Sequence, residues 1–213
     1  GAAIFLQDCE RVAIDGIVAR NMESDGLSFQ IVHDLAVENS TFADLRGNGI
    51  HPGSGSQRPV IRRNTVRRCG CGIGWCWGVK YGFAEENLIE ECGTGISIGH
   101  RDTDNVMRRN TVRSSGRCGL FFREDPPARA AHRNLIEENV FENAGTAAAP
   151  GYLVDLAGPV DSVAIRKNAF VSTRPGTLKA AVRIGPAVTK LLLDANEFRN
   201  VERPVEDLRP AAG

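Results

Sequence analysis

The sequence has 213 residues, of which 42% are hydrophobic and 6% aromatic, and its 26 basic and 26 acidic side chains leave no net charge. This composition predicts a single globular domain over residues 1–213 and argues against a disordered chain. Nucleic acid and membrane are not expected partners, because no overall positive charge attracts polyanions and no apolar run approaches the roughly 20 residues that span a bilayer.

A short repeat organises the chain, and each copy places an Asn between two short apolar segments. In chain order the copies are VENSTF (37–42), IRRNTV (61–66), AEENLI (84–89), MRRNTV (107–112), IEENVF (136–141), IRKNAF (165–170) and LDANEF (193–198). Gly16 in IDGIV takes the place that Asn39 has in the next copy. A repeat of about 23 residues, with longer intervals toward the C-terminus, is typical of a solenoid.

A second signal follows each Asn, in which a small residue precedes three or four residues of alternating apolar character. The copies are DGLSF (25–29), NGIHP (48–52), CGIGW (71–75), TGISI (94–98), CGLFF (118–122), PGYLV (150–154) and AAVRI (180–184). Alternation of this kind indicates a short strand. Each repeat is therefore expected to hold three strands: one before the Asn, one after it and one after the small residue.

Asn and Gly tolerate a left-handed backbone best, so one such residue between two strands makes a sharp corner. Stacked Asn side chains can also hydrogen bond to one another in a ladder. The spacing of a leucine-rich horseshoe is missing, and a propeller would need about 40 residues per blade. We therefore predict an all-β fold, a right-handed parallel β-helix of about eight coils with three short strands per coil.

The repeat resembles that of the pectin-lyase-like superfamily of right-handed β-helix proteins, over nearly the whole chain. The resemblance implies a compact Asn corner, substrate loops on either side of the third strand and a secreted or periplasmic location. These folds usually have an N-terminal cap, whereas GAAIFLQDCERVAI enters a coil almost at once. A packing partner or a missing segment at this uncapped end is therefore expected, and the chain is a candidate fragment of a longer one.

The third strand of each repeat is the candidate binding face, because the insertions at 123–131, 142–150 and 172–179 flank it and insertions in a solenoid gather on the binding face. If Leu27, Ile50, Ile73, Ile96, Leu120 and Val182 point inward, alternation sends the intervening residues outward. These outward residues are Ser28, His51, Gly74, Ser97, Phe121 and Arg183.

Polar and aromatic residues that follow this strand on successive coils are expected to share one groove. Hydrolysis of a glycosidic bond needs two carboxyl groups, and Asp102 with Glu124 or Asp125 meets that need. Elimination needs a base beside a cation, and His51 or His100 is the candidate base, with Lys80 and Tyr81 as further candidates. Sugar stacking and pairing with acidic groups are assigned to Trp77, Lys80, Tyr81, Arg101, Arg123 and Arg183.

Three motifs carry a weaker resemblance to polygalacturonases: ESDGLSF, GNGIHPGSGS and GTGISIG. Asp25 matches the first aspartate of that family. Gly47 and Asn48 stand where its aspartate pair belongs, and Thr94 replaces the histidine of its third motif. The resemblance therefore implies a shared substrate face, whereas the loss of the aspartate pair speaks against the same hydrolytic mechanism.

The same residues also have simpler, purely structural interpretations. Asp102 and Asp104 could simply close a turn by bonding local backbone amides. The carboxylates in DTDN (102–105) are candidate calcium ligands, because calcium prefers several oxygen ligands. Their spacing does not match a known coordination loop, so no residue is assigned as a metal ligand. The cysteines form no CxxC pair, so Cys69 with Cys92 and Cys71 with Cys118 are interpreted as small apolar residues stacked on nearby coils.

The preferred function is an enzyme, a polysaccharide lyase or glycoside hydrolase that cleaves an acidic polysaccharide or oligosaccharide. Uronate epimerisation shares its first step with the lyase. The alternative is a noncatalytic β-helix that binds glycans or serves as a structural stalk, as in adhesins and tail fibres.

Overall fold

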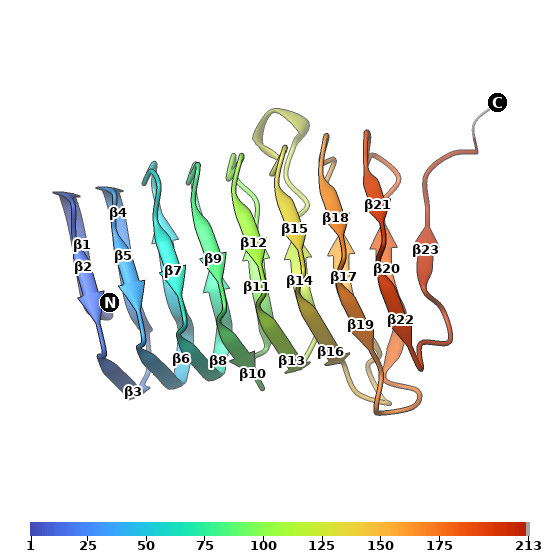
Figure 1. The fold of residues 1–213 in the computed structure, drawn as a ribbon, viewed down its shortest axis with the longest axis horizontal. Coiled ribbons are helices and arrows are strands. Elements are labelled where there is room, and N and C mark those ends of the chain that lie inside the picture. The colour runs from blue at the N-terminus through green and yellow to red at the C-terminus, as the bar shows by residue number, and fades with distance from the viewer. Residues whose placement is uncertain (212–213) are drawn as a thin grey trace.

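Short parallel strands follow one another through residues 1–211, which this computed structural model describes, and wind into a solenoid whose axis is horizontal in Figure 1. The single helical element among these residues is a 3₁₀ turn, η1 (Pro127–Arg129). No helix in the same range is long and apolar enough to cross a membrane.

The first face of the solenoid is a parallel sheet of eight strands, one from each coil. Its strands lie just before the Asn corner. They are β2 (Ala13–Asp15), β5 (Ala36–Glu38), β7 (Val60–Arg62), β9 (Phe83–Glu85), β12 (Val106–Arg108), β15 (Leu135–Glu137), β18 (Ala164–Arg166) and β21 (Leu192–Asp194).

The second face follows the Asn corner. Its strands are β3 (Val18–Met22), the first halves of β6 (Thr41–Gly53) and β8 (Thr65–Gly74), β10 (Leu88–Glu90), β13 (Thr111–Ser115), β16 (Val140–Ala144), β19 (Ala169–Val171) and β22 (Glu197–Arg199). The third face consists of β1 (Ala2–Glu10), β4 (Asp25–His33), the last halves of β6 and β8, β11 (Thr94–Ile98), β14 (Cys118–Phe122), β17 (Gly151–Leu156), β20 (Leu178–Ile184) and β23 (Val205–Asp207). Because β6 and β8 run through the bend between these faces, both faces belong to one sheet.

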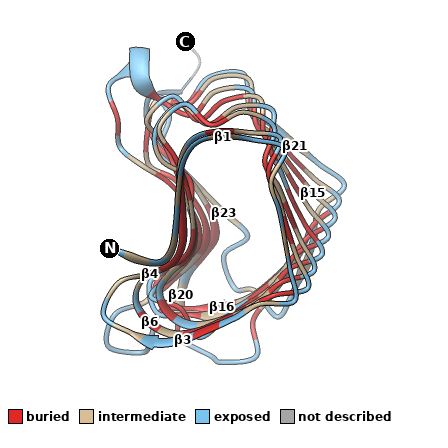
Figure 2. Cartoon of the chain, turned by 90° about the vertical axis from the view of Figure 1, so that its left-hand side faces the viewer, coloured by how far each residue is buried: buried red, intermediate tan, exposed pale blue. Residues whose placement is uncertain are grey.

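The predicted all-β solenoid is confirmed: eight complete coils are present and β1 adds a portion of another. Viewed along the axis, the coils superpose, and buried residues concentrate on the walls that enclose the interior (Figure 2). The three expected insertions do flank the third face, since 123–131 follows β14, 142–150 leads into β17 and 172–179 leads into β20.

The Asn corner differs from the prediction in one residue. The left-handed backbone belongs to the residue before each Asn, such as Arg63 (φ 54°) and Arg109 (φ 52°), and not to the Asn itself. Asn39 (φ 50°) occupies this left-handed position, so Ser40 takes the place that Asn64 has in the next coil. Asn39 was therefore assigned to the wrong register.

The corner Asn side chains point inward because they complete the hydrogen bonds of the buried backbone. The Nδ2 group of each Asn except the last donates to Oδ1 of the next at 2.9–3.0 Å. The same groups also donate to backbone carbonyls, for example Asn110 to Ala84 O at 2.8 Å. The row consists of Asn64, Asn87, Asn110, Asn139, Asn168 and Asn196.

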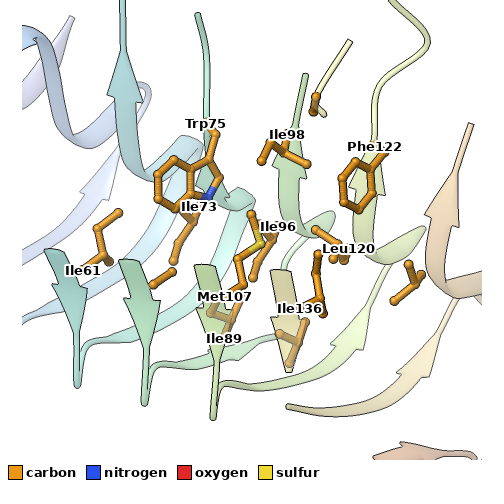
Figure 3. Close-up of a cluster of buried hydrophobic side chains, with 14 of the residues drawn as sticks. Ile61, Ile73, Trp75, Ile89, Ile96, Ile98, Met107, Leu120, Phe122 and Ile136 are labelled. Carbon is orange, nitrogen blue, oxygen red and sulfur yellow. The ribbon is translucent and has the colours of Figure 1, made fainter. Parts of the chain in front are cut away.

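The core consists of apolar columns that run along the axis, one residue per coil (Figure 3). The column of Ile50, Ile73, Ile96 and Leu120 is at most 1% exposed, and Trp75, two residues after Ile73, is fully buried. A column of glycines lies beside it, at positions where there is no room for a side chain. A Cβ at Gly95, for instance, would collide with Gly119 O and Val112 Cγ1.

Candidate functional site

The outward row of the third face is confirmed by the strand register. Ser28 pairs with His51. Ile50 pairs with Ile73, so the residues that follow them, His51 and Gly74, are also neighbours. Gly74 in turn pairs with Ser97 on the next coil. Asp155 fills the coil that the sequence prediction left out between Phe121 and Arg183. The complete row is Ser28, His51, Gly74, Ser97, Phe121, Asp155, Arg183 and Glu206.

Three adjoining hollows of about 380, 390 and 300 Å³ lie along this row. His51 borders the first and the middle one, whereas Arg117 and Phe121 border the middle and the last one. The hollows therefore form one linear groove parallel to the solenoid axis, which we call the strand-face groove. A groove of this shape suits an extended chain molecule.

His51 is held by a carboxylate of the preceding coil. Its Nδ1–H donates to Asp25 Oδ2 at 2.7 Å, and Asp25 Oδ1 accepts hydrogen bonds from the Asn48 backbone N–H (2.7 Å) and side chain (2.9 Å). Burial raises the pKa of Asp25, but the hydrogen bonds from His51 and Asn48 outweigh it and leave the pKa below its ordinary value. The carboxylate thus fixes the tautomer of His51 and leaves Nε2 as an acceptor.

Arginine side chains supply positive charge to the same groove. Arg123 donates to Ser97 Oγ (2.8 Å) and to Trp75 O (2.6 Å), which holds its guanidinium against the strands. Arg117 stacks over the Phe121 ring at 4.2 Å and borders two of the hollows. Arg183 lies in the last hollow, where it donates to Asp155 at 3.0 Å.

A second polar cluster lies at the edge of the middle hollow. The Cys76 Sγ atom lies 3.5 Å from His100 Nδ1, and His100 Nε2 lies 3.0 Å from Asp125 Oδ1. Asp125 Oδ2 also accepts the His100 backbone N–H at 2.8 Å. Burial and the charge of Arg123 lower the pKa of His100 below its ordinary value.

Asp102 lies beneath this turn and is fully buried. Its carboxylate accepts the backbone N–H groups of Val79 (2.9 Å) and Gly99 (3.2 Å) and pairs with Arg123 at 3.3 Å. Burial raises the pKa of Asp102 to about 7. Glu124, in contrast, is exposed and borders the last hollow. Asp102 and Glu124 therefore do not face each other across an open cleft.

The remaining predicted ligand residues gather elsewhere. Trp77, Lys80 and Arg101 border a separate hollow of about 410 Å³ next to the strand-face groove. Tyr81 is 53% exposed and borders none of the hollows described above. The single groove that the sequence predicted is thus divided between the strand-face groove and a neighbouring hollow, with the ring of Trp77 against that of His100 (centroids 5.1 Å apart) between them.

The sequence prediction did not assign Asn48, Arg117 or Cys76 to the site, and it gave Asp25 only as a family match. The signal for Asp25 was present, because its register partner is Asn48, three residues before His51. Nothing in the sequence pattern indicated that Cys76 lies next to His100, because the conformation of the loops that carry them decides this contact. Among residues 1–211 no three His, Cys, Asp or Glu side chains converge in an arrangement that could hold a metal ion.

The chain belongs to the right-handed β-helix family, because residues 2–178 match the family model described as "Right handed beta helix region". The right-handed parallel β-helix expected from the sequence is thereby confirmed. A comparison with curated protein sequences finds no match.

Solved structures with the same fold include proteins that act on carbohydrates. An alginate lyase from Paenibacillus sp. is 11% identical with a TM-score of 0.65, covering 87% of this chain and 76% of that one. The A-module of a mannuronan C-5 epimerase from Azotobacter vinelandii is 13% identical (TM-score 0.70; 94% and 57% covered). A DFA-IIIase from Arthrobacter chlorophenolicus is 12% identical (TM-score 0.69; 92% and 54% covered). The present chain spans little more than half of the last two.

Proposed function

We propose that this protein is an enzyme that acts on an acidic polysaccharide lying along the strand-face groove, and that His51 abstracts the proton next to a uronate carboxylate. The observation that carries the proposal is the hydrogen bond between His51 and Asp25, because His51 also borders the middle hollow together with Arg117 and Arg123. A base with a fixed tautomer and nearby cations is what proton abstraction beside a carboxylate requires.

The chemistry follows from these positions. With Nδ1–H donated to Asp25, Nε2 of His51 accepts the proton at C5 of the uronate. Arg117 or Arg123 offsets the negative charge that develops on the carboxylate. In a lyase the C4–O bond then breaks and the leaving oxygen takes a proton from water, which leaves an unsaturated sugar and a new reducing end. In an epimerase a proton returns to the other face of C5.

Hydrolysis through Asp102 with Glu124 or Asp125 has less support. Asp102 is shielded from solvent, and Asp125 is 8% exposed and accepts the His100 backbone N–H. A pair of carboxyl groups for hydrolysis must flank the scissile bond in an open cleft. The similarity to a lyase and an epimerase agrees with the proposal, although sequence identities of 11% and 13% carry fold information alone.

The test is a panel of uronate and neutral polysaccharides followed in three ways: absorbance of unsaturated products, reducing ends, and deuterium exchange at C5 by NMR. We expect unsaturated products or C5 exchange with a uronate polymer, and their loss in His51→Ala. His132→Gln is the control, because His132 lies on a loop outside the groove, bonded to Asp161 N and Pro127 O.

Two results would overturn the proposal. Reducing ends without unsaturated products would indicate hydrolysis. Saturable binding of the polysaccharide without any turnover, unchanged in His51→Ala, would indicate a noncatalytic glycan-binding module.

A further inference from the structure

A thiol, an imidazole and a carboxylate lie in sequence at the edge of the strand-face groove. Cys76 Sγ faces Nδ1 of His100 at 3.5 Å, and Nε2 of the same ring faces Asp125 Oδ1 at 3.0 Å. The two ring nitrogens therefore face the thiol and the carboxylate, and the hydrogen bond that joins His100 to Asp125 runs from the His100 backbone N–H to Oδ2. Covalent catalysis uses this arrangement, in which a base activates the nucleophile and a third group orients the base.

The local backbone holds these groups in place. Asp125 Oδ2 accepts the His100 backbone N–H, so the carboxylate binds both the ring and the main chain of the same residue. Gly99 makes this close approach feasible, because a Cβ there would collide with Asp125 Oδ2 and Arg123 Nε. The Nε–H of Arg123 is itself buried and lacks a partner among the described atoms.

The cluster is also accessible. Cys76 is partly exposed and borders the middle hollow together with His51, Ser97 and Arg123. The His100 side chain is 29% exposed, and Trp77 beside it is 52% exposed and borders the neighbouring hollow. A substituent on a chain in the groove would thus meet the thiol from the side.

We propose that Cys76 is the nucleophile of a second activity, the removal of O-acyl ester groups from a polysaccharide in the groove. His100 acts as general base and acid, and Asp125 is a positioning residue. The inference rests on the proposed function only for the identity of the molecule that carries the ester. It is independent of His51.

The reaction balances with water as the single co-reactant. Sγ attacks the ester carbonyl while the thiol proton moves to His100 Nδ1. The bond between the carbonyl carbon and the sugar oxygen breaks, and the sugar oxygen takes the proton from His100, which leaves a thioester on Cys76. Water then attacks the thioester, His100 takes a proton from it, and the free acid departs as the thiol regains its proton.

The electrostatics agree with this order of steps. The lowered pKa of His100 keeps the imidazole neutral near pH 7, so it can accept a proton. Burial raises the pKa of the Cys76 thiol to about 11, and Arg123 opposes that rise. The resting state is therefore a neutral thiol and imidazole pair, and the proton moves only as the Sγ–carbon bond forms. Asp125 then stabilises the imidazolium.

The first experiment uses p-nitrophenyl acetate and needs no glycan. We expect a burst of nitrophenolate and one acetyl group on the peptide that contains Cys76, detected by mass spectrometry. Cys76→Ala abolishes both, and His100→Ala slows the burst by about 10²–10⁴-fold. Cys9→Ser is the control, since Cys9 lies on β1 outside the hollows, within hydrogen-bond distance of Gln7 O.

Asp125→Asn tests the positioning role through the pH profile. The negative charge of Asp125 raises the pKa of His100, so its removal moves the acid limb of the rate profile to lower pH as well as slowing the burst. A merely structural role would lower the yield of folded protein without moving the limb. An unshifted limb overturns the role of Asp125.

The second experiment uses O-acetylated and de-acetylated samples of the same uronate polysaccharide and measures acetate release. We expect release from the acetylated sample, its loss in Cys76→Ala and its persistence in His51→Ala, so this activity and the proposed function fail separately. Acetylation of the protein that is unchanged in Cys76→Ala, or Cys76 alkylation by iodoacetamide that is unaffected by His100→Ala, would overturn the nucleophile. Acetylation of Cys76 without acetate release from the polysaccharide would overturn the glycan ester as its substrate.

Discussion

The Nδ1 atom of His51 lies 2.7 Å from Oδ2 of Asp25, which comes from the preceding coil. This hydrogen bond spans 26 residues of sequence and exists because the solenoid stacks one coil on the next. It gives a histidine on the groove a fixed tautomer, and the first prediction follows from it.

Asp25→Asn should lower the activity on a uronate polymer by at least about tenfold, because an amide can turn its NH₂ toward His51 and favour the wrong tautomer. The change should appear mainly in kcat, with KM little altered. Asp34→Asn serves as the control, because Asp34 forms an exposed ion pair with Arg58. Equal kcat values for the two variants would contradict the assignment of His51 as the base.

Arg117→Gln should raise KM for an acidic polysaccharide about tenfold or more, since a charged hydrogen bond contributes roughly 1.5–3 kcal/mol. The effect should shrink as salt is added, because the interaction is electrostatic. Initial rates at low and high ionic strength provide the measurement. Arg133→Gln, at an outer corner bonded to Asp104, should leave KM unchanged. A KM for Arg117→Gln that matches wild type at low salt would count against a cationic groove.

Asp102 should make the protein less stable as the pH rises. Burial raises the pKa of this carboxyl from an ordinary value of 3.8 to about 7, so the folded protein holds a proton that the unfolded chain has lost. Its contribution is fully present below about pH 3.8 and is lost as the pH rises through about 7. The loss approaches about 4 kcal/mol at 1.36 kcal/mol per pKa unit.

Urea unfolding between pH 5 and pH 8 measures this effect. Asp102→Asn should have a flatter dependence of unfolding free energy on pH than wild type, because its side chain stays neutral. Asp104→Asn should keep the wild-type slope, since the hydrogen bond from Arg133 holds the pKa of Asp104 below this window. Identical slopes for wild type and Asp102→Asn would refute the shift.

Asn110→Ala should destabilise the protein by at least about 2 kcal/mol. Oδ1 of Asn110 accepts two hydrogen bonds from Asn87, and its Nδ2 group donates to Ala84 O and Asn139 Oδ1. Each buried group left without a partner costs about 1–3 kcal/mol. Asn39→Gly should change stability by less than about 0.5 kcal/mol, because Asn39 is exposed and Gly suits its left-handed backbone. Similar midpoints of chemical unfolding for both variants would contradict this difference.

Gly95→Ala should cost about 1–3 kcal/mol through overpacking, because the added methyl group collides with Gly119 O and Val112 Cγ1. Gly116→Ala is the matched control, since a Cβ there lies 3.5 Å or more from its nearest neighbours. Thermal unfolding compares the two. A melting temperature for Gly95→Ala equal to that of wild type would show that the column tolerates side chains.

Local patterns in the sequence were sufficient to predict much of the fold. The alternation around Ile50, Ile73 and Ile96 predicted which side chains face the core, because a strand has a period of two wherever it occurs. The repeat also predicted the coils and the insertions beside the third face. The corner prediction was wrong by one residue at Asn39. The left-handed position and the inward Asn are adjacent in each coil, and in VENSTF the Asn occupies the left-handed position.

The sequence by itself determined the solenoid and the outward position of His51, since both depend on periodicity that each coil repeats. Only the tertiary structure decided that Asp25 pairs with His51, that Asp102 is buried under Arg123 and that Cys76 meets His100. These relationships arise between side chains of different coils, whose distances depend on loop conformation and on how far each side chain reaches. No regular period in the sequence encodes those two quantities.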